Sequence, residues 1–210
     1  MIDSQLMEKL VDLKEKETLD LIRKEKDSGT DPMAILEACR EGMILVGTRY
    51  EKGEYFLPEL IMAGEIFKQA SEILGTLPGD SRAGTKGTVV FGTVQGDVHD
   101  IGKNVVVTNL RAVGYEVHDL GVDVTPEQFV TKLRETGAGV LGLSGLITTA
   151  YDGMKDTVEA LANAGLRDRV KVMVGGGIMD EKVQAYAGAD AYGNDPTEAA
   201  KLCQQFIGGK

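Results

Sequence analysis

The chain has 210 residues, enough for one large domain or two small ones, and 42% of them are hydrophobic, which supports a buried core. Its formal net charge is −10. Since no basic cluster offsets this charge, we expect neither nucleic acid nor an anionic membrane as a partner. No apolar run approaches the roughly 20 residues of a membrane span, and the first residues carry no secretory signal. We therefore expect a cytoplasmic protein, with Cys39 and Cys203 as reduced, packed thiols.

Residues 1–77 are predicted to form a helical domain. Two helices are expected over 3–13 and 15–27, and Asp31–Pro32 and Pro58 mark the starts of two more. Apolar residues recur at spacings of three and four in these last two helices, and this periodicity predicts one buried face on each. The two series are Leu36, Cys39, Met43, Val46 and Tyr50, then Leu60, Ala63, Phe67, Ala70 and Leu74. Four short helices with short connections are typical of a small bundle.

A polar segment rich in turn-forming residues, 78–87, is predicted to link this bundle to a second domain over 88–210. The expected strands of that domain cover 88–94, 115–119, 139–144, 170–175 and 190–193. The expected helices cover 101–113, 126–136, 150–164, 180–187 and 196–207. Thr125 and Pro126 begin one helix with a capping box, and Asp195–Pro196 begin another.

Alternating strands and helices are typical of a parallel sheet that has helices on both faces. Five strands fit the flavodoxin-like order 2-1-3-4-5. The predicted fold class is therefore α/β, with an N-terminal four-helix bundle and a C-terminal flavodoxin-like (Rossmann-type) five-stranded parallel sheet.

Residues 96–102, Gly-Asp-Val-His-Asp-Ile-Gly, form the most informative segment, because they connect the first expected strand to the helix after it. His99 on such a loop can face a ligand, Asp97 can hold its other ring nitrogen, and Gly102 lets a bulky group approach the backbone. This pattern suits a metal ligand backed by a carboxylate. Asp100 is the better candidate to cap the helix. The alternative is an ordinary surface histidine.

Two further segments are expected at the same edge of the sheet. Ser144 ends the third strand, and Gly175–Gly177 follow the fourth. Because the carboxyl ends of parallel strands meet at one edge, where ligands bind in such folds, both segments are predicted to lie near the His99 loop.

These three motifs in order, Asp-x-His-x-x-Gly, Ser144-x-Leu146 and the glycine run, resemble the cobalamin-binding module of the methionine-synthase type. The resemblance implies a cobalamin or related corrinoid whose cobalt is ligated by His99, with Asp97 tuning the ligation as its catalytic partner. It also implies a set of cofactor-binding residues in this domain. They are Gly96, Asp97, Val98, His99, Asp100, Ile101, Gly102, Ser144, Leu146, Thr148, Gly175, Gly176, Gly177, Tyr192 and Asn194.

Several of these assignments have alternatives. The resemblance implies that Ser144 meets the buried nucleotide tail of the cofactor and that Leu146 lines the pocket, but Leu146 could belong to the core. Thr148 could cap the next helix, and Gly102 could be a weak helix start. The run 175–177 would leave room for the tail, or could be a flexible turn.

One position departs from the family pattern. Methionine synthases carry a hydroxyl residue six positions after the Ser-x-Leu serine, where it hydrogen-bonds the aspartate and completes a relay to solvent. Here that position is Ala150, with Thr149 beside it. The pair of Asp97 and His99 is therefore expected to act alone or with water.

Residues 47–60 resemble the helical cap that covers the upper face of the corrin in this family. The alignment implies that Tyr50 and Leu57 face the methyl group, although both could be ordinary bundle core. His118 lies in an expected strand and is interpreted as structural. A swing of the cap about the linker 78–87 would expose the cobalt.

The chain is too short to add a barrel of roughly 250 residues for a methyl donor, so it most resembles the small corrinoid shuttles of anaerobic methyltransferase systems. The resemblance implies a methyl-carrier subunit in one-carbon metabolism. Its cobalt would take a methyl group from a substrate-specific methyltransferase. A second methyltransferase would pass the group to tetrahydrofolate or a thiol, and a reductive activator would be a third partner.

Other classes remain open at this stage. A cobalamin-dependent sensor or regulatory module would use the same parts without catalytic activity, but no DNA-binding or signalling domain is evident. A mutase subunit would lack the helical bundle. A flavodoxin-like nucleotide-binding protein would carry His99 incidentally, and would be colourless after cobalamin had been offered.

Overall fold

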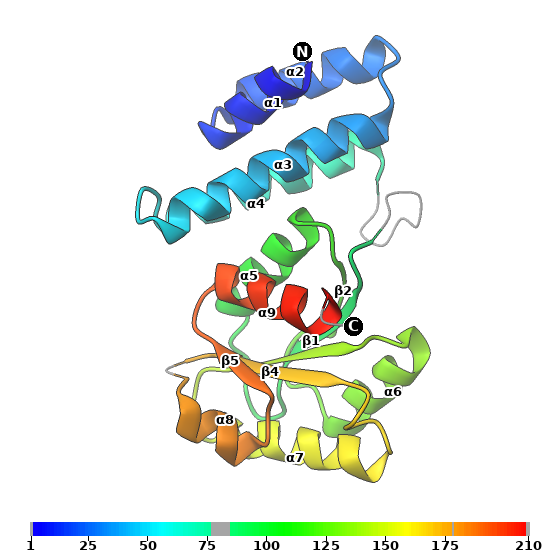
Figure 1. Cartoon of the computed structure of the whole chain (residues 1–210), viewed down its shortest axis with the longest axis vertical. Coiled ribbons are helices and arrows are strands. Elements are labelled where there is room, and N and C mark those ends of the chain that lie inside the picture. Colours follow the sequence, from blue (N-terminus) through cyan, green and yellow to red (C-terminus); the bar gives the residue numbers. More distant parts are fainter. Residues whose placement is uncertain (1, 77–84, 178, 209–210) are drawn as a thin grey trace. The chain divides into compact units, whose positions relative to one another are not determined.

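The computed structural model describes residues 2–76, 85–177 and 179–208. The chain divides into two compact units, one of residues 1–85 with 111–114 and one of residues 86–110 with 115–210 (Figure 1). Most of the predicted linker, residues 78–84, lies outside the described residues. Among the described helices, none is both long and apolar enough to cross a membrane.

The first unit is the predicted helical bundle. Its helices are α1 (Ile2–Val11), α2 (Glu15–Asp27), α3 (Pro32–Glu51) and α4 (Leu57–Leu74). As expected, the Asp31 carboxylate accepts a hydrogen bond from the Met33 N–H at 3.2 Å and starts α3. The apolar series predicted for α3 and α4 lie in the core of this unit, except that Tyr50 is only partly buried against it.

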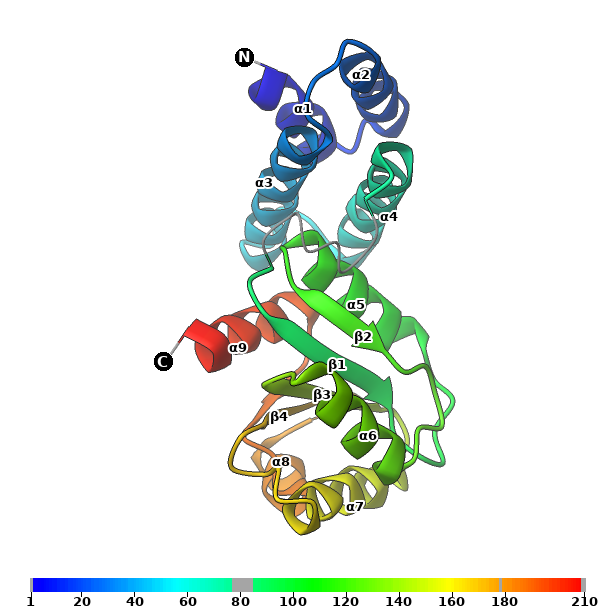
Figure 2. The same ribbon diagram turned by 90° about the vertical axis from the view of Figure 1, so that its right-hand side faces the viewer.

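The second unit contains the predicted parallel sheet in the order β2-β1-β3-β4-β5, which confirms the flavodoxin-like topology. Its strands are β1 (Thr88–Thr93), β2 (Glu116–Asp119), β3 (Val140–Gly145), β4 (Lys171–Gly176) and β5 (Ala191–Gly193). Its helices are α5 (Ile101–Ala112), α6 (Pro126–Thr136), α7 (Ala150–Asn163), α8 (Glu181–Ala187) and α9 (Pro196–Gly208). In both views, α5 and α9 cover one face of the sheet, and α6, α7 and α8 cover the other (Figures 1 and 2).

Local capping explains why two of these helices begin where the sequence predicts. At the start of α6, the Thr125 N–H donates to Gln128 Oε1 at 2.8 Å, and Thr125 Oγ1 accepts from the Gln128 N–H at 3.4 Å. At the start of α9, Asp195 Oδ1 accepts main-chain hydrogen bonds from Thr197 and Glu198. Both cysteines are buried and free, and burial raises the pKa of each thiol to about 12.

Close packing inside the sheet requires a glycine at the centre of β3. A Cβ atom on Gly142 would lie only 2.2 Å from Cε2 of Phe91, whose ring covers this position from the neighbouring strand. Gly139, at the entrance to the same strand, has no such neighbour, since a Cβ there would meet nothing within 4 Å.

We predict that Gly142→Ala destabilises the protein by about 1–3 kcal/mol, because the added methyl group must displace the Phe91 ring in a packed core. Gly139→Ala is the matched control and should change the free energy of unfolding by less than about 0.5 kcal/mol. Urea unfolding followed by circular dichroism measures both. Equal effects of the two substitutions would contradict this account of the packing.

Candidate functional site

The register of the sheet brings the predicted segments to one edge. Thr93 of β1 pairs with Ser144 of β3, Ser144 with Gly175 of β4, and Gly175 with Gly193 of β5. These four residues therefore form a row across neighbouring strands near their carboxyl ends, and the His99 loop leaves β1 from the same row. This is the edge at which sheets of this topology bind ligands.

The Asp97 carboxylate is the centre of the His99 loop. Asp97 is 1% exposed, and its Oδ1 lies 2.6 Å from His99 Nδ1 and accepts the His99 main-chain N–H at 3.0 Å. Since an ionised carboxylate only accepts hydrogen bonds, we assign the ring proton to Nδ1. The lone pair then lies on Nε2, which is the atom free to bind a metal.

The second oxygen of Asp97 reaches a different strand connection. Oδ2 accepts main-chain N–H bonds from Leu146 at 2.6 Å and Ile147 at 3.3 Å, both just after β3. Burial by itself would raise the pKa of Asp97, but the hydrogen bonds from His99, Leu146 and Ile147 outweigh it and lower the pKa below its ordinary value. The carboxylate is thus a buried anion that ties the loop after β1 to the loop after β3.

The residue at position 150 is an alanine and is buried, so it offers no hydroxyl to the Asp97 carboxylate as the family pattern would. Thr149 is exposed and makes no side-chain cap on α7. The main-chain N–H groups of Leu146 and Ile147 contact the carboxylate instead. That Asp97 and His99 act alone or with water, without the hydroxyl relay, stays a prediction.

Large apolar side chains on the His99 loop, at the start of α5 and on the loop after β3 are exposed. Val98 is 68% exposed, Ile101 78%, Leu146 48% and Ile147 39%, while half of the His99 side chain is accessible. The alternative that Leu146 belongs to the core is therefore wrong. Exposed apolar residues on segments that Asp97 connects to His99 are compatible with a surface for a flat, largely apolar ligand.

The glycines of the site lie in two different environments. A Cβ on Gly102 would meet nothing within 4 Å, so no described neighbour excludes a larger residue there. By contrast, a Cβ on Gly176 would lie 2.5 Å from the Gly145 carbonyl oxygen, and one on Gly177 would lie 2.8 Å from that of Leu146. Gly176 also has φ +124°. Backbone contact with the end of β3 thus requires glycine here, so a merely flexible turn does not describe this run.

The remaining predicted residues of this unit occupy varied environments. Ser144 is buried at the end of β3, with 6% of its surface exposed. Tyr192 packs partly buried against the core of the sheet, and Asn194 Oδ1 accepts the Met179 N–H at 3.3 Å. Thr148 is exposed and accepts the Tyr151 N–H through its carbonyl, so its side chain does not cap α7.

Asp100 differs from its predicted role as a helix cap. It directly precedes α5, but its Oδ2 accepts from the Asn104 side-chain amide at 3.2 Å, and its main-chain oxygen accepts the Asn104 N–H. Among the described residues, the Asp100 carboxylate thus bonds to the Asn104 side chain and not to a main-chain N–H at the start of α5.

Residues that the sequence reading missed hold this loop in place. The hydroxyl of Thr93, which is fully buried, donates to the His99 carbonyl at 3.0 Å. Lys103 is buried at the start of α5, and its Nζ donates to Asp119 Oδ2 at 2.5 Å. Asp123 contacts both Gly96 and Asp97. The sequence carries no signal for these roles, because the burial of Lys103 and its need for a partner are evident only in the structure.

Tyr50 and Leu57 lie in the helical unit, near the end of α3 and at the start of α4. Tyr50 is partly buried against the bundle core, and Leu57 is 44% exposed. Further large apolar side chains are exposed in this unit. Ile44 and Leu45 lie in α3, Phe56 directly precedes α4, and Ile61 and Met62 lie in its first turns. The alternative that both residues belong to the bundle core therefore holds in part for Tyr50 and does not hold for Leu57.

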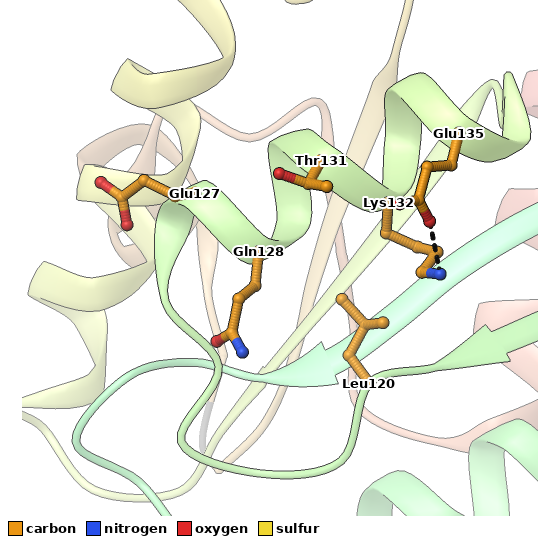
Figure 3. A pocket seen from close by; sticks show the side chains of 6 residues that line it. All are labelled: Leu120, Glu127, Gln128, Thr131, Lys132 and Glu135. Carbon is orange, nitrogen blue, oxygen red and sulfur yellow. Dashed lines mark hydrogen bonds and ion pairs between the residues drawn. The ribbon is translucent and has the colours of Figure 1, made fainter.

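A separate hollow of about 310 Å³ lies between Leu120 and α6 in the sheet unit (Figure 3). Its other lining residues come from α6 and are polar or charged, and Lys132 Nζ donates to Glu135 Oε2 at 2.6 Å within it. None of the predicted site residues lines this hollow. It is therefore distinct from the His99 site.

Comparison with known proteins agrees with the geometry. Models of a B12 binding domain match residues 2–74 and 87–201. Dimethylamine corrinoid protein 2 of Methanosarcina acetivorans is 38% identical over 98% of this chain and 96% of that protein. This chain belongs to the B12-binding corrinoid proteins.

Solved structures of corrinoid proteins are similar to this one. A cobalamin-binding protein from Desulfitobacterium hafniense DCB-2 is 36% identical over 98% of both chains, with a TM-score of 0.75. The methanol:cobalamin methyltransferase complex MtaBC of Methanosarcina barkeri is 28% identical, with a TM-score of 0.86 over 100% of this chain and 80% of that one.

The donor set of this corrinoid protein fits such a cofactor. Within residues 2–76, 85–177 and 179–208, there is no group of three or more His, Cys, Asp or Glu side chains that could hold a metal ion. A corrin surrounds its cobalt with four ring nitrogens, so a single protein imidazole is sufficient. The His99 imidazole is half accessible and could serve in this way, and the open space at Gly102 is compatible with a bulky ligand.

We predict that Asp97→Asn destabilises the protein by about 1–3 kcal/mol at pH 7, because an amide group would face main-chain N–H donors in a buried site. The folded-state pKa of Asp97 is lowered, and its unfolded value is about 3.9. Its stabilising contribution is therefore complete above about pH 5 and is lost as the pH falls through the folded-state pKa.

Urea unfolding of both proteins between pH 7 and pH 3 measures this difference. The difference in the free energy of unfolding between the wild type and Asp97→Asn should become smaller as the pH falls. A gap that stays constant over this range would contradict the proposed ionisation of Asp97.

Proposed function

We propose that this corrinoid protein carries a methyl group on cobalt between two methyltransferases, with His99 as the lower ligand of the metal. The observation that carries the proposal is the 2.6 Å contact between Asp97 Oδ1 and His99 Nδ1, which leaves Nε2 as the ligating atom. The names of the similar proteins support the carrier over a regulatory module, since they describe a dimethylamine corrinoid protein and a methanol:cobalamin methyltransferase complex.

When bound, the corrinoid supplies a cobalt atom that accepts a methyl group and gives it up again. The protein's own part is to hold and orient. His99 presents a neutral imidazole, and Asp97 fixes the ring tautomer and raises the basicity of Nε2. Asp97 stays anionic in this role because four N–H groups donate to its two oxygens.

The remaining site residues of the sheet unit would receive the rest of the cofactor. The Ser144 hydroxyl would hydrogen-bond the nucleotide tail, and Leu146 would line its pocket. The space at Gly102 would admit the corrin. Other residues would border the cofactor, and they are Gly96, Val98, Asp100, Ile101, Thr148, Gly175, Gly176, Gly177, Tyr192 and Asn194.

The helical unit would cover the upper face of the corrin, with Tyr50 and Leu57 toward the methyl group. Apolar side chains there would exclude water from the reacting centre. Three partners follow from the carrier role. A substrate-specific methyltransferase would load the methyl group, an acceptor methyltransferase would transfer it to tetrahydrofolate or a thiol, and a reductive activator would restore the cobalt.

The decisive experiment is an absorption spectrum of the protein after incubation with hydroxocobalamin. The wild type should show a histidine-ligated corrinoid, and His99→Ala should show the water- or base-ligated form. His118→Ala is the matched control, because His118 is the other histidine of the chain and pairs with Glu116 at 3.1 Å on β2. Its spectrum should match the wild type.

Retention of no corrinoid by the wild type would reject the cofactor. A histidine-ligated spectrum in His99→Ala would reject the ligand, and loss of that spectrum in His118→Ala would move the ligand to His118. Each result therefore separates the cofactor from the residue that binds it.

We further predict that Gly102→Leu abolishes corrinoid retention without unfolding the protein. A side chain there meets no described atom within 4 Å, and replacing glycine in a helix is favourable by up to about 1 kcal/mol. The apoprotein should therefore unfold at the same or a slightly higher urea concentration. Gly102→Ala should retain more corrinoid than Gly102→Leu. Full retention by Gly102→Leu would show that the cofactor does not approach this position.

A further inference from the structure

Asp123, in the loop between β2 and α6, has an uncommon conformation for a residue with a side chain. Its φ is +53°, in the left-handed region that favours glycine and tolerates Asp and Asn. In this conformation its carboxylate and its main-chain N–H bond to two consecutive residues of the His99 loop. Oδ1 accepts the Gly96 N–H at 2.8 Å, and the Asp123 N–H donates to the Asp97 carbonyl at 3.0 Å.

These two hydrogen bonds hold the first and last polar atoms of the dipeptide Gly96–Asp97. Gly96 is also left-handed, with φ +85°. The backbone of the loop thus has a fixed path immediately before His99, although Asp123 is 24 residues further along the chain and does not touch the imidazole.

The surrounding backbone continues the same attachment. Val94 and Val124 form a parallel bridge, and the Val124 N–H donates to the Thr93 carbonyl at 3.0 Å. Because the backbone before Asp123 and after it is attached to β1 and its loop, the carboxylate of Asp123 has a defined position relative to Gly96.

We propose that Asp123 is a positioning residue for His99. It acts through Gly96 and Asp97, whose carboxylate orients the imidazole. The inference rests on the proposed function, because it concerns the strength with which His99 ligates the corrinoid. Because the described bonds of Asp123 go to Gly96 and Asp97, its substitution should weaken the ligation by histidine and leave the other contacts of the corrinoid unchanged.

Two variants separate the carboxylate from the backbone conformation. Asp123→Gly retains the left-handed backbone and the N–H bond to Asp97 but removes the acceptor for Gly96. Asp123→Asn retains an acceptor oxygen and tolerates the same φ. Asp31→Gly is the matched control, since it removes the same kind of bond, from a main-chain N–H to an Asp carboxylate, in the helical unit.

The first measurement is the affinity for hydroxocobalamin in the wild-type and His99→Ala backgrounds. Asp123→Gly should bind about 10-fold more weakly than the wild type, as expected when an outer partner of a metal ligand is lost. In His99→Ala it should have no further effect, because the two residues act as one unit. Asp123→Asn should restore most of the affinity, and Asp31→Gly should bind as the wild type does.

The second measurement needs no cofactor. In the apoprotein, nitrogen-15 spectra of the His99 imidazole should show the Nδ1–H tautomer, and Asp123→Gly should lose this preference. An equal loss of affinity in both backgrounds would overturn the inference, and so would an unchanged tautomer. If the wild type binds no corrinoid, the proposed function fails, while the tautomer measurement still decides whether Asp123 orients His99.

Discussion

The Asp97 carboxylate is the interaction on which the arrangement of the site depends. Its two oxygens accept four N–H groups, two from His99 on the loop after β1 and two from Leu146 and Ile147 on the loop after β3. A buried carboxylate without these donors would be costly. With them it remains an anion, fixes the imidazole tautomer and holds two strand connections together. The chemistry of the site and its local stability are therefore consequences of the same contacts.

At the same edge of the sheet, glycines occupy positions where a side chain would collide with the backbone. Glycines at the end of β4 allow the backbone of that strand to approach the end of β3 closely, since a Cβ on Gly176 or Gly177 would collide with carbonyl oxygens there. At Gly102 the protein leaves open space instead. The residues that do project, such as Val98 and Ile101, are apolar and exposed. A row of strand ends made of two small hydroxyl residues and two glycines, with exposed apolar residues on the neighbouring loops, is compatible with a large ligand at this edge.

A protein that presents one ligand atom leaves the reactive chemistry to the cofactor and to its partners. The described residues offer an oriented imidazole and exposed apolar side chains at one edge of the sheet, which is compatible with the proposed carrier role. The family match covers both units of the chain, and the similar proteins belong to systems for different methyl donors, dimethylamine in one case and methanol in another. Choice of donor is then a property that we assign to the partner rather than to this chain.

Local patterns in the sequence determined the elements and the strand order. These patterns act between residues that are close in the sequence. They are the helical periodicity of apolar residues in α3 and α4, the capping residues Asp31 and Thr125, and the alternation of strands and helices after Thr88. The structure confirms the elements that they predict. Asp97 and His99 could also be paired from the sequence, because they are two residues apart. Only the tertiary structure decided that Leu146 is exposed, that Asp100 does not cap α5 with its carboxylate, and that Asp123 holds the His99 loop. These outcomes depend on hydrogen bonds and backbone contacts between residues that are 27 to 50 positions apart, or on side chains that compete for one acceptor. The helix, strand and capping propensities of single residues do not determine which of several partners a polar group will bond to in the folded chain.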